Sequence, residues 1–343
     1  MKVGIIGATG YGGLELIRLL HRHTEISSID LFTSSDAGTP FSHKYSHLLN
    51  IYDTPLHRIE IEYLAKLDVL FTSTPSGVTS RLLPPIIGKG PRIIDLSGDY
   101  RLTGDEYREW YGKEPAPETA LDKAVYGLTE WNRDAIRESK LIANPGCYPT
   151  AVLLSLLPAV KNGLIDSSQL IIDAKSGVSG AGNQPNQMTH FSETNESLSI
   201  YKVNRHQHIP EIERGLSAFA GGTRPITFST HLVPMTRGIL SAAYAPLADG
   251  VTEKHLQECY QDIYENEAFV RLIPPGPKFG TNQVYGSNYC DLQLYVDQRT
   301  NRVTIVSVID NLVKGAAGQA VQNMNVQFGI EESVGLDLVP SFI

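Results

Sequence analysis

One cysteine lies in a setting that favours nucleophilic chemistry. Residues 144–150 read Asn-Pro-Gly-Cys-Tyr-Pro-Thr, and an apolar run follows at once. Pro145 and Gly146 predict a tight turn, and Pro149 suits the first turn of a helix. Cys147 would then face the N–H groups of that helix start, where the helix dipole stabilises a thiolate and lowers the cysteine pKa. The alternative is a small buried residue at a helix start.

Two histidines are candidates for proton transfer. Residues 205–212 read Arg-His-Gln-His-Ile-Pro-Glu-Ile, so His206 and His208 precede a proline that suits another helix start. A thiol needs a proton acceptor and an oxyanion later needs a donor, which favours an acid or base role beside a nucleophilic Cys147. We expect no metal site, because no cysteine or carboxylate cluster lies nearby at ligand spacing. Surface histidines are the other alternative.

The start of the chain predicts a nucleotide site. Residues 2–7 indicate a short buried strand, and residues 14–20 carry apolar side chains at helical spacing. The connecting segment reads Gly-Ala-Thr-Gly-Tyr-Gly-Gly. Gly7 would permit the tight turn, Gly10 would let the backbone approach a pyrophosphate, and Gly13 would allow the helix to pack closely on the strand. A merely structural turn is the alternative.

Strands and helices continue to alternate through the first part of the chain. We predict further strands at residues 29–33, 67–72, 92–96 and 141–144, with a helix-like stretch at residues 77–83. This alternation favours a parallel, doubly wound sheet with ligands at the carboxyl ends of its strands. The rule gathers the following residues on one rim: Thr33, Ser34, Ser35, Thr74, Pro75, Ser76 and Cys147.

The choice between NADP and NAD depends on the end of the second strand. Asp30 comes early and Asp36 late for an acid that binds the ribose hydroxyls of NAD. Hydroxyls at residues 33–35 suit the 2′-phosphate of NADP, with Lys44 as the nearest cation. The sequence favours NADP and leaves NAD open.

The second part of the chain predicts a different sheet. Alternation over residues 290–296 indicates a strand with one solvated face, whereas residues 303–309 indicate a more central strand. We therefore expect a largely antiparallel or mixed sheet. Further predictions are a strand at residues 170–174, a glycine and serine loop at residues 176–182, a helix at residues 251–265 and a helix opening at residue 311.

Length and composition narrow the class of protein. A chain of 343 residues favours two domains, and a net charge of -8 without a basic block argues against nucleic acid or an acidic membrane as partner. Cys147, Cys259 and Cys290 are too widely spaced for a disulfide framework or a metal pair. The longest apolar run, residues 151–160, is too short to span a bilayer, and a strand at the very start leaves no room for a signal peptide. We expect a cytoplasmic protein.

Taken together, the motifs resemble those of N-acetyl-gamma-glutamyl-phosphate reductases over essentially the whole chain. The segments that carry the resemblance are residues 7–13, 94–102, 126–130, 144–150, 206–212 and 310–322. That family is similar in architecture to aspartate-semialdehyde and glyceraldehyde-phosphate dehydrogenases. The resemblance implies an α/β fold: a Rossmann-type doubly wound parallel sheet domain at residues 1–146 and 313–343, and an α+β catalytic and oligomerisation domain with a mixed or antiparallel sheet at residues 147–312.

The resemblance also implies an activity, which is NADPH-dependent reduction of N-acetyl-gamma-glutamyl phosphate to N-acetylglutamate 5-semialdehyde and phosphate in arginine biosynthesis. Cys147 would displace phosphate to form a thioester, and hydride transfer would follow, with His206 as proton donor. His206 is preferred to His208 because it matches the first histidine of the family motif. A group of this kind contributes about a hundred- to ten-thousand-fold to the rate.

Other residues are assigned to binding. Arg101 or Arg237 would hold the phosphate or carboxylate of the substrate, although a structural ion pair is the alternative for Arg101. Asn144 and His208 complete the predicted substrate site. The predicted cofactor site consists of Gly7, Ala8, Thr9, Gly10, Tyr11, Gly12, Gly13, Thr33, Ser34, Ser35, Pro75, Ser76, Ser176, Gly177 and Asn311. The resemblance further implies a homodimer or homotetramer.

Two rival functions stay open. One is a reductase of carrier-bound aminoadipyl or glutamyl phosphate in lysine biosynthesis, for which an acidic chain offers little docking surface to an acidic carrier. The other is a non-catalytic NADP-sensing module, which would bind the nucleotide and be indifferent to alkylation of its thiols. A short-chain dehydrogenase is excluded, because no tyrosine has a lysine four residues later.

Overall fold

The computed structural model divides the chain into two compact units. It describes residues 1–222, 225–276 and 278–342. The first unit comprises Met1–Pro145 and Ala316–Leu336, and the second comprises Gly146–Gly315 and the C-terminal segment from Asp337. The sequence placed residues 337–343 in the first part, whereas the backbone N–H of Ser341 donates to the carbonyl of Tyr285 in the second unit.

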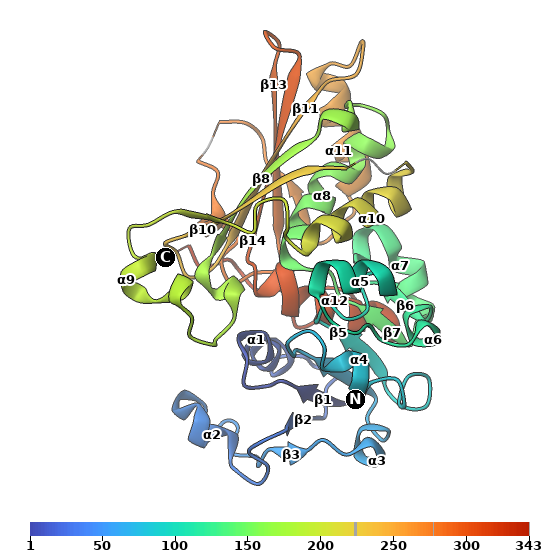
Figure 1. Cartoon of the computed structure of the whole chain (residues 1–343), viewed down its shortest axis with the longest axis vertical. Coiled ribbons are helices and arrows are strands. Elements are labelled where there is room, and N and C mark those ends of the chain that lie inside the picture. The colour runs from blue at the N-terminus through green and yellow to red at the C-terminus, as the bar shows by residue number, and fades with distance from the viewer. Residues whose placement is uncertain (223–224, 277, 343) are drawn as a thin grey trace. The chain divides into compact units, whose positions relative to one another are not determined.

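The first unit is built on a parallel sheet of 7 strands in the order β3-β2-β1-β4-β5-β7-β6. Its strands are β1 (Lys2–Ile6), β2 (Ser28–Thr33), β3 (His57–Arg58), β4 (Val69–Thr72), β5 (Arg92–Asp95), β6 (Ala124–Tyr126) and β7 (Leu141–Ala143). Its helices are α1 (Tyr11–Leu20), α2 (Phe41–Lys44), α3 (Ile61–Leu64), α4 (Thr79–Leu82), α5 (Gly104–Tyr111), α6 (Glu118–Leu121), α7 (Thr129–Glu138) and α12 (Gly318–Phe328). The doubly wound parallel sheet predicted from the sequence is confirmed (Figure 1).

Apolar runs explain why these strands lie at the centre of the first unit. Val3 and Ile5 in β1, and Leu70 and Phe71 in β4, are completely buried. Strands that are apolar on successive positions are typical of parallel sheets covered on both faces. The sheet order leaves β3 and β6 at its edges, where the sequence predicted no strand. Each is only two or three residues long, too short to show a period.

The second unit contains a mixed sheet of 7 strands in the order β12-β13-β14-β11-β8-β10-β9. Its strands are β8 (Ile171–Gly177), β9 (Ser199–Tyr201), β10 (Thr227–Val233), β11 (Ile239–Pro246), β12 (Val270–Leu272), β13 (Cys290–Asp297) and β14 (Arg302–Ile309). Its helices are α8 (Cys147–Lys161), α9 (Phe191–Thr194), α10 (His208–Ala220) and α11 (Glu253–Tyr264). The β8–β10 and β12–β13 pairs are parallel and the others antiparallel, which confirms the predicted mixed sheet. As predicted, β14 is a central strand.

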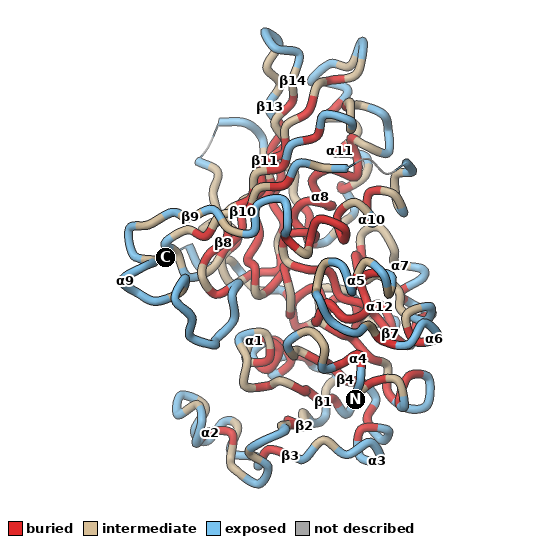
Figure 2. Tube along the Cα trace, viewed as in Figure 1, coloured by how far each residue is buried: buried red, intermediate tan, exposed pale blue. Residues whose placement is uncertain are grey.

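Helix α8 is the buried helix of the second unit, and Figure 2 shows it among buried residues. Pro158 lies inside this helix and lacks the N–H that would bond to the carbonyl of Leu154. The hydroxyl of Tyr264 in α11 donates to that carbonyl at 2.6 Å. The hydroxyl of Tyr260 donates to the next carbonyl, that of Ser155, at 2.5 Å. Helix α11 therefore supplies the hydrogen bond that the Leu154 carbonyl loses because of Pro158.

The solvated face predicted for residues 290–296 is wrong for two of its polar residues. Asp291 is 1% exposed and Gln293 is 0% exposed. Arg271 of the neighbouring strand β12 forms two bonds to the Asp291 carboxylate, at 2.6 and 2.9 Å. The Gln293 amide donates to the carbonyl of Pro274 at 2.8 Å. Residues of β12 and of the segment that follows it cover these two side chains. The sequence of residues 290–296 alone does not indicate this cover.

Candidate active site

Cys147 is the first residue of α8, as the sequence predicts. Gly146 caps the helix in an extended conformation, and its carbonyl accepts from the backbone N–H of Thr150 at 2.9 Å. The N–H of Gly146 donates to the buried carboxylate of Glu211 at 2.7 Å. Glu211 lies in the first turn of α10, so the start of that helix anchors the turn that presents the cysteine.

Gly315 packs directly against the cysteine. A Cβ atom at position 315 would lie 2.9 Å from the Cβ of Cys147 and 3.3 Å from its Cα. Cβ atoms do not approach one another this closely, so only glycine fits without a shift of the cysteine. The small residues predicted at the helix opening thus have a specific packing role. That opening begins at Val313 rather than at residue 311, because the Asp310 carboxylate accepts from the N–H groups of Leu312 and Val313.

The two histidines have different roles in the local structure. The backbone N–H of His208 donates to Nδ1 of His206 at 3.1 Å, which assigns the proton of a neutral His206 ring to Nε2. His206 is 3% exposed, and burial, with a smaller contribution from the charge of Lys202, lowers its pKa to about 3. His206 is therefore a neutral hydrogen-bond donor through Nε2, whereas His208 begins α10.

Aromatic side chains pack around the two histidines. The hydroxyls of Tyr148 and Tyr201 lie 3.1 Å apart, and both rings stand edge-on to His206 with centroids 5.5 and 5.6 Å away. Burial raises the pKa of Tyr201 to about 12, opposed by its hydrogen bond with Tyr148 and reinforced by the charge of Cys147. Burial likewise raises the pKa of Tyr148. Neither tyrosine was assigned a role from the sequence, because only the fold brings residues 148 and 201 together.

Arg237 and Asn311 hold loops of the second unit in place. The Arg237 guanidinium pairs with the fully buried carboxylate of Asp310 at 3.1 Å. The Asn311 side chain accepts from the N–H of Gly238 at 2.7 Å and donates to the hydroxyl of Ser179 at 3.0 Å. The predicted cofactor residues Ser176 and Gly177 end strand β8. Their binding roles stay predictions.

In the first unit the glycine segment has the predicted packing. Gly7 has a φ of +85°, and a Cβ there would lie 2.2 Å from the carbonyl oxygen of Ser73. A Cβ on Gly13 would lie 2.4 Å from the Gly7 oxygen, so the turn and close-packing roles of these two glycines are confirmed. A Cβ on Gly10 would meet nothing closer than 3.5 Å. The pyrophosphate contact of Gly10 stays a prediction.

A buried carboxylate orders the loop after β4, which carries Pro75 and Ser76. Asp99 accepts from the Gly77 N–H at 2.7 and 2.9 Å and from the Ser80 N–H at 2.9 Å. It also accepts from the hydroxyl of Tyr107 at 2.6 Å. Asp99 lies within a family motif, yet the sequence assigned it no function. Asp99 is close to this loop only because β5, which precedes it, pairs with β4.

Arg101 and Asn144 form a second anchor in the first unit. The buried Arg101 guanidinium donates to the carbonyl of Asn144 at 2.8 Å and to the carbonyl of Leu96 at 2.7 Å. The Asn144 side chain donates to the carbonyl of Ala316 at 3.1 Å and accepts from the amide of Asn323 at 3.0 Å. The substrate contact of Arg101 and its alternative, an ion pair with a nearby acid, both stay predictions.

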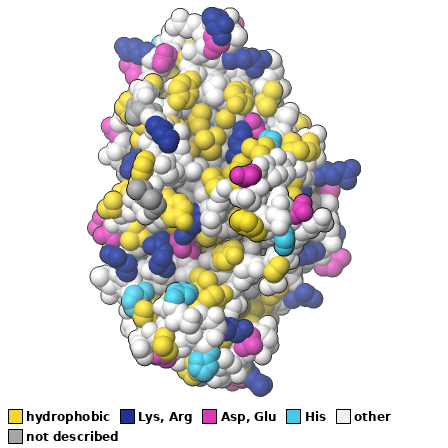
Figure 3. All heavy atoms as spheres, turned by 90° about the vertical axis from the view of Figure 1, so that its left-hand side faces the viewer, with side chains coloured by type: hydrophobic (Ala, Val, Ile, Leu, Met, Phe, Trp, Pro, Cys, Tyr) yellow, Lys and Arg dark blue, Asp and Glu magenta, His cyan; other side chains and the backbone are white. Residues whose placement is uncertain are grey.

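In the part of the chain that the structure describes, no group of three or more His, Cys, Asp or Glu side chains is arranged to hold a metal ion. None of the helices within residues 1–222, 225–276 and 278–342 has the length and apolar character to cross a bilayer. Figure 3 shows Lys and Arg side chains dispersed among acidic and apolar ones on the face in view.

The chain matches two family profiles. Residues 2–139 match the NAD binding domain of semialdehyde dehydrogenases, and residues 147–311 match the dimerisation domain of the same group. The chain is 54% identical to the N-acetyl-gamma-glutamyl-phosphate reductase of Geobacillus thermodenitrificans over 343 residues, with 100% of each chain covered. It is 49% identical to the protein of the same name from Bacillus subtilis over 344 residues, again with 100% of each covered.

Solved structures agree with the fold. Aspartate semialdehyde dehydrogenase II from Vibrio cholerae, complexed with ASA, superposes with a TM-score of 0.71 at 17% identity and covers 96% of this chain and 98% of its own. Aspartate semialdehyde dehydrogenase with NADP from Candida albicans gives a TM-score of 0.68 at 15% identity, with 95% and 97% covered. At such identities the likeness concerns the fold alone.

Proposed function

The chain belongs to the N-acetyl-gamma-glutamyl-phosphate reductase family, and we propose that it reduces N-acetyl-gamma-glutamyl phosphate to N-acetylglutamate 5-semialdehyde with release of phosphate. The proposed reductant is NADPH. The observation that carries the proposal is the position of Cys147 as first residue of α8, next to Gly315 and followed by Tyr148, whose ring packs against a neutral His206.

The first chemical step in this proposal belongs to the cysteine. The sulfur of Cys147 attacks the acyl carbon, the carbon–oxygen bond to phosphate breaks, and phosphate leaves with the electron pair. N–H groups at the start of α8 point towards the developing oxyanion and the helix dipole stabilises the attacking thiolate. The product of this step is a thioester on Cys147.

The second step reduces that thioester. NADPH, when bound, supplies a hydride to the carbonyl carbon. The Nε2–H of His206 then donates a hydrogen bond to the oxyanion, because Nδ1 already accepts from His208. The carbon–sulfur bond breaks next, which releases the aldehyde and returns the thiolate of Cys147. In this scheme His206 acts as an oxyanion donor and not as the base that deprotonates the thiol.

The binding residues follow from the anchors described above. Residues 7–13, at the start of α1, suit the pyrophosphate, and Ser76 belongs to the ordered loop beyond β4. Arg237, fixed by Asp310, is the proposed contact for a substrate anion. Arg101 acts by fixing the backbone at Asn144. Ser176, Gly177 and Asn311 complete the proposed cofactor contacts. A homodimer or homotetramer in the cytoplasm is proposed, supported by the match of residues 147–311 to a dimerisation domain.

The test is a semialdehyde assay run in reverse. N-acetylglutamate semialdehyde, phosphate and NADP should give NADPH, and omission of phosphate should stop the reaction at the Cys147 thioester, after a single hydride transfer and before any acyl transfer. The aminoadipate homologue, offered free and on a carrier, addresses the rival reductase, and NAD in place of NADP addresses the cofactor. A protein that binds NADP yet shows no phosphate-dependent turnover with any of these would support the sensing module and overturn the proposal.

A further inference from the structure

Two groups predicted to hold the 2′-phosphate of NADP are already engaged with a carboxylate. The Asp36 carboxylate accepts from Nζ of Lys44 at 2.6 Å and from the hydroxyl of Ser35 at 2.5 Å. The Thr33 hydroxyl oxygen accepts from the backbone N–H of Ser35 at 3.3 Å. The charges of Asp36 and Lys44 cancel, so this cluster offers no net positive charge to a phosphate. Another cation is needed.

Arg58, in the edge strand β3, lies next to Thr33 and so close to the end of β2. In β3 it lies directly opposite Thr33, the last residue of β2, in the parallel register of these two strands. Residues opposite one another in neighbouring strands project to the same face of a sheet. Arg58 is exposed, and within the described ranges no carboxylate pairs with it. A guanidinium of this kind suits a bidentate contact with a phosphate.

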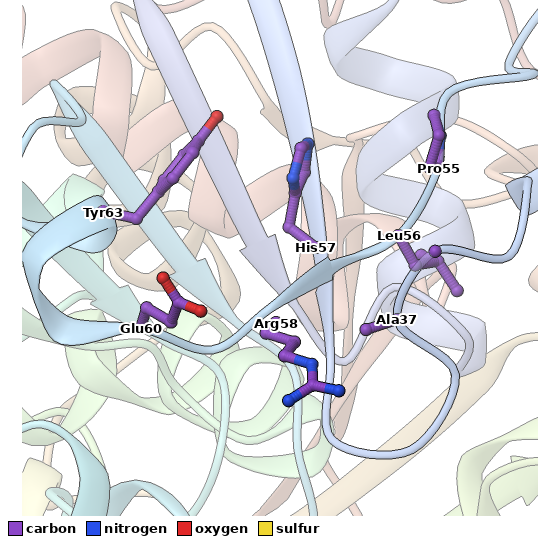
Figure 4. Close-up of a pocket in the computed structure, with 8 residues that line it drawn as sticks. Ala37, Pro55, Leu56, His57, Arg58, Glu60 and Tyr63 are labelled. Atoms are coloured by element: carbon purple, nitrogen blue, oxygen red, sulfur yellow. The ribbon is translucent and has the colours of Figure 1, made fainter.

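A cavity of about 410 Å³ lies beside Arg58. Figure 4 shows the Arg58 side chain extending towards Ala37, in the loop that follows β2, whereas His57 points the opposite way. Leu56 and Pro55 give the cavity an apolar wall. The hydroxyl of Tyr45, in the chain segment between β2 and β3, donates to the carbonyl of Thr9 at 2.7 Å, so this segment also touches the glycine turn.

We propose that Arg58 binds the 2′-phosphate of NADP and is the residue that gives this chain its preference for NADP over NAD. The proposal rests on the proposed function only for the identity of the nucleotide. Arg58 could not be predicted as a binding residue from the sequence. It lies 25 positions from Thr33, its neighbour across the sheet, and its strand β3 is only two residues long. Arg58 belongs to β3 and lies beside the carboxyl end of β2, which is where an arginine commonly accommodates a 2′-phosphate. It is therefore the proposed specificity-determining residue.

The experiment compares Arg58→Gln with Arg137→Gln by calorimetric binding of NADP, NAD and 2′,5′-ADP to the full chain without substrate. Arg137 is an exposed arginine of the same unit that pairs with Asp134, so its change removes an equal charge elsewhere. We expect Arg58→Gln to weaken NADP and 2′,5′-ADP roughly tenfold to a hundredfold and to leave NAD unchanged. Arg137→Gln should change none of the three.

Equal losses for NADP and NAD in Arg58→Gln, or no loss for either, would overturn the proposal. So would a variant Lys44→Gln that abolishes the preference for NADP while Arg58→Gln keeps it, because Lys44 would then leave Asp36 for the phosphate. Because binding is measured without substrate, the result is independent of turnover. A chain that binds 2′,5′-ADP through Arg58 yet reduces no acyl phosphate would sink the proposed function and leave this inference intact.

Discussion

The backbone N–H of His208 donates to Nδ1 of His206 at 3.1 Å, and this bond distinguishes the two histidines. Because Nδ1 accepts, the proton of the neutral ring is on Nε2. His206 can therefore donate to an oxyanion, whereas His208 contributes its backbone and the start of α10. The sequence preferred His206 by motif alignment alone, and the geometry supplies a physical reason for the same choice.

The first prediction concerns His206→Asn. Loss of the Nε2 donor should lower turnover in the semialdehyde assay by about a hundred- to ten-thousand-fold. The affinity for NADP should stay unchanged, since His206 is not among the proposed cofactor contacts. His208→Asn is the control and should cost less, because it keeps the backbone N–H. A larger loss in His208→Asn would exchange the two roles.

The second prediction concerns stability against pH. His206 has its pKa lowered to about 3 in the folded chain, below the usual value of 6.5. Between these values the unfolded state binds a proton that the folded state does not, so stability should fall as the pH drops from 6.5 towards 3. The slope is up to roughly 1.4 kcal/mol per pH unit for one such group. Urea unfolding of wild type and His206→Asn should show a shallower acid slope in the variant; equal slopes would contradict the assignment.

The third prediction concerns Gly315→Ala. The new methyl group would lie 2.9 Å from the Cβ of Cys147, so the cysteine must shift. We expect turnover to fall by at least about tenfold, because small misplacement of a nucleophile is costly. Gly280→Ala is a matched control in the same unit, since its nearest neighbour is a side-chain atom 3.6 Å away. Equal activity in the two variants would show that the contact is unimportant.

The fourth prediction concerns Glu211, which holds the turn before the cysteine. Glu211→Ala removes the acceptor for the Gly146 N–H, and an unsatisfied buried donor costs about 1–3 kcal/mol. We expect a lower unfolding temperature and lower turnover. Glu211→Gln keeps an oxygen that accepts the same bond, so it should recover part of both. Failure of Gln to perform better than Ala would mean that the charge, not the hydrogen bond, is what matters.

The sequence predicted the features that depend on local patterns. The Gly7 turn, the close packing at Gly13 and the helix that starts at Cys147 all follow from residue types within a few positions. The buried apolar runs predicted the parallel sheet. These features need no knowledge of which distant segments meet.

Features that depend on contacts between distant parts of the chain could not be predicted from the sequence. Tyr201 meets Tyr148 only because β9 lies at the edge of the sheet of the second unit. Asp99 orders the loop at Gly77 only because β4 and β5 are neighbours. The alternation in its strand predicts a solvated Gln293, but its amide donates to the carbonyl of Pro274 in the fold. In each case the partner lies far away in the chain, and no local pattern marks it.

The most direct measurement of the central claim is the mass of the protein after reaction with N-acetyl-gamma-glutamyl phosphate in the absence of NADPH. After an acid quench, the intact chain should be heavier by one acyl group, and peptide mapping should place the group on Cys147. Cys259→Ser should acylate like wild type, and Cys147→Ser should not form the thioester. If Cys147 stays unmodified while the same preparation turns over with NADPH added, the covalent mechanism is contradicted.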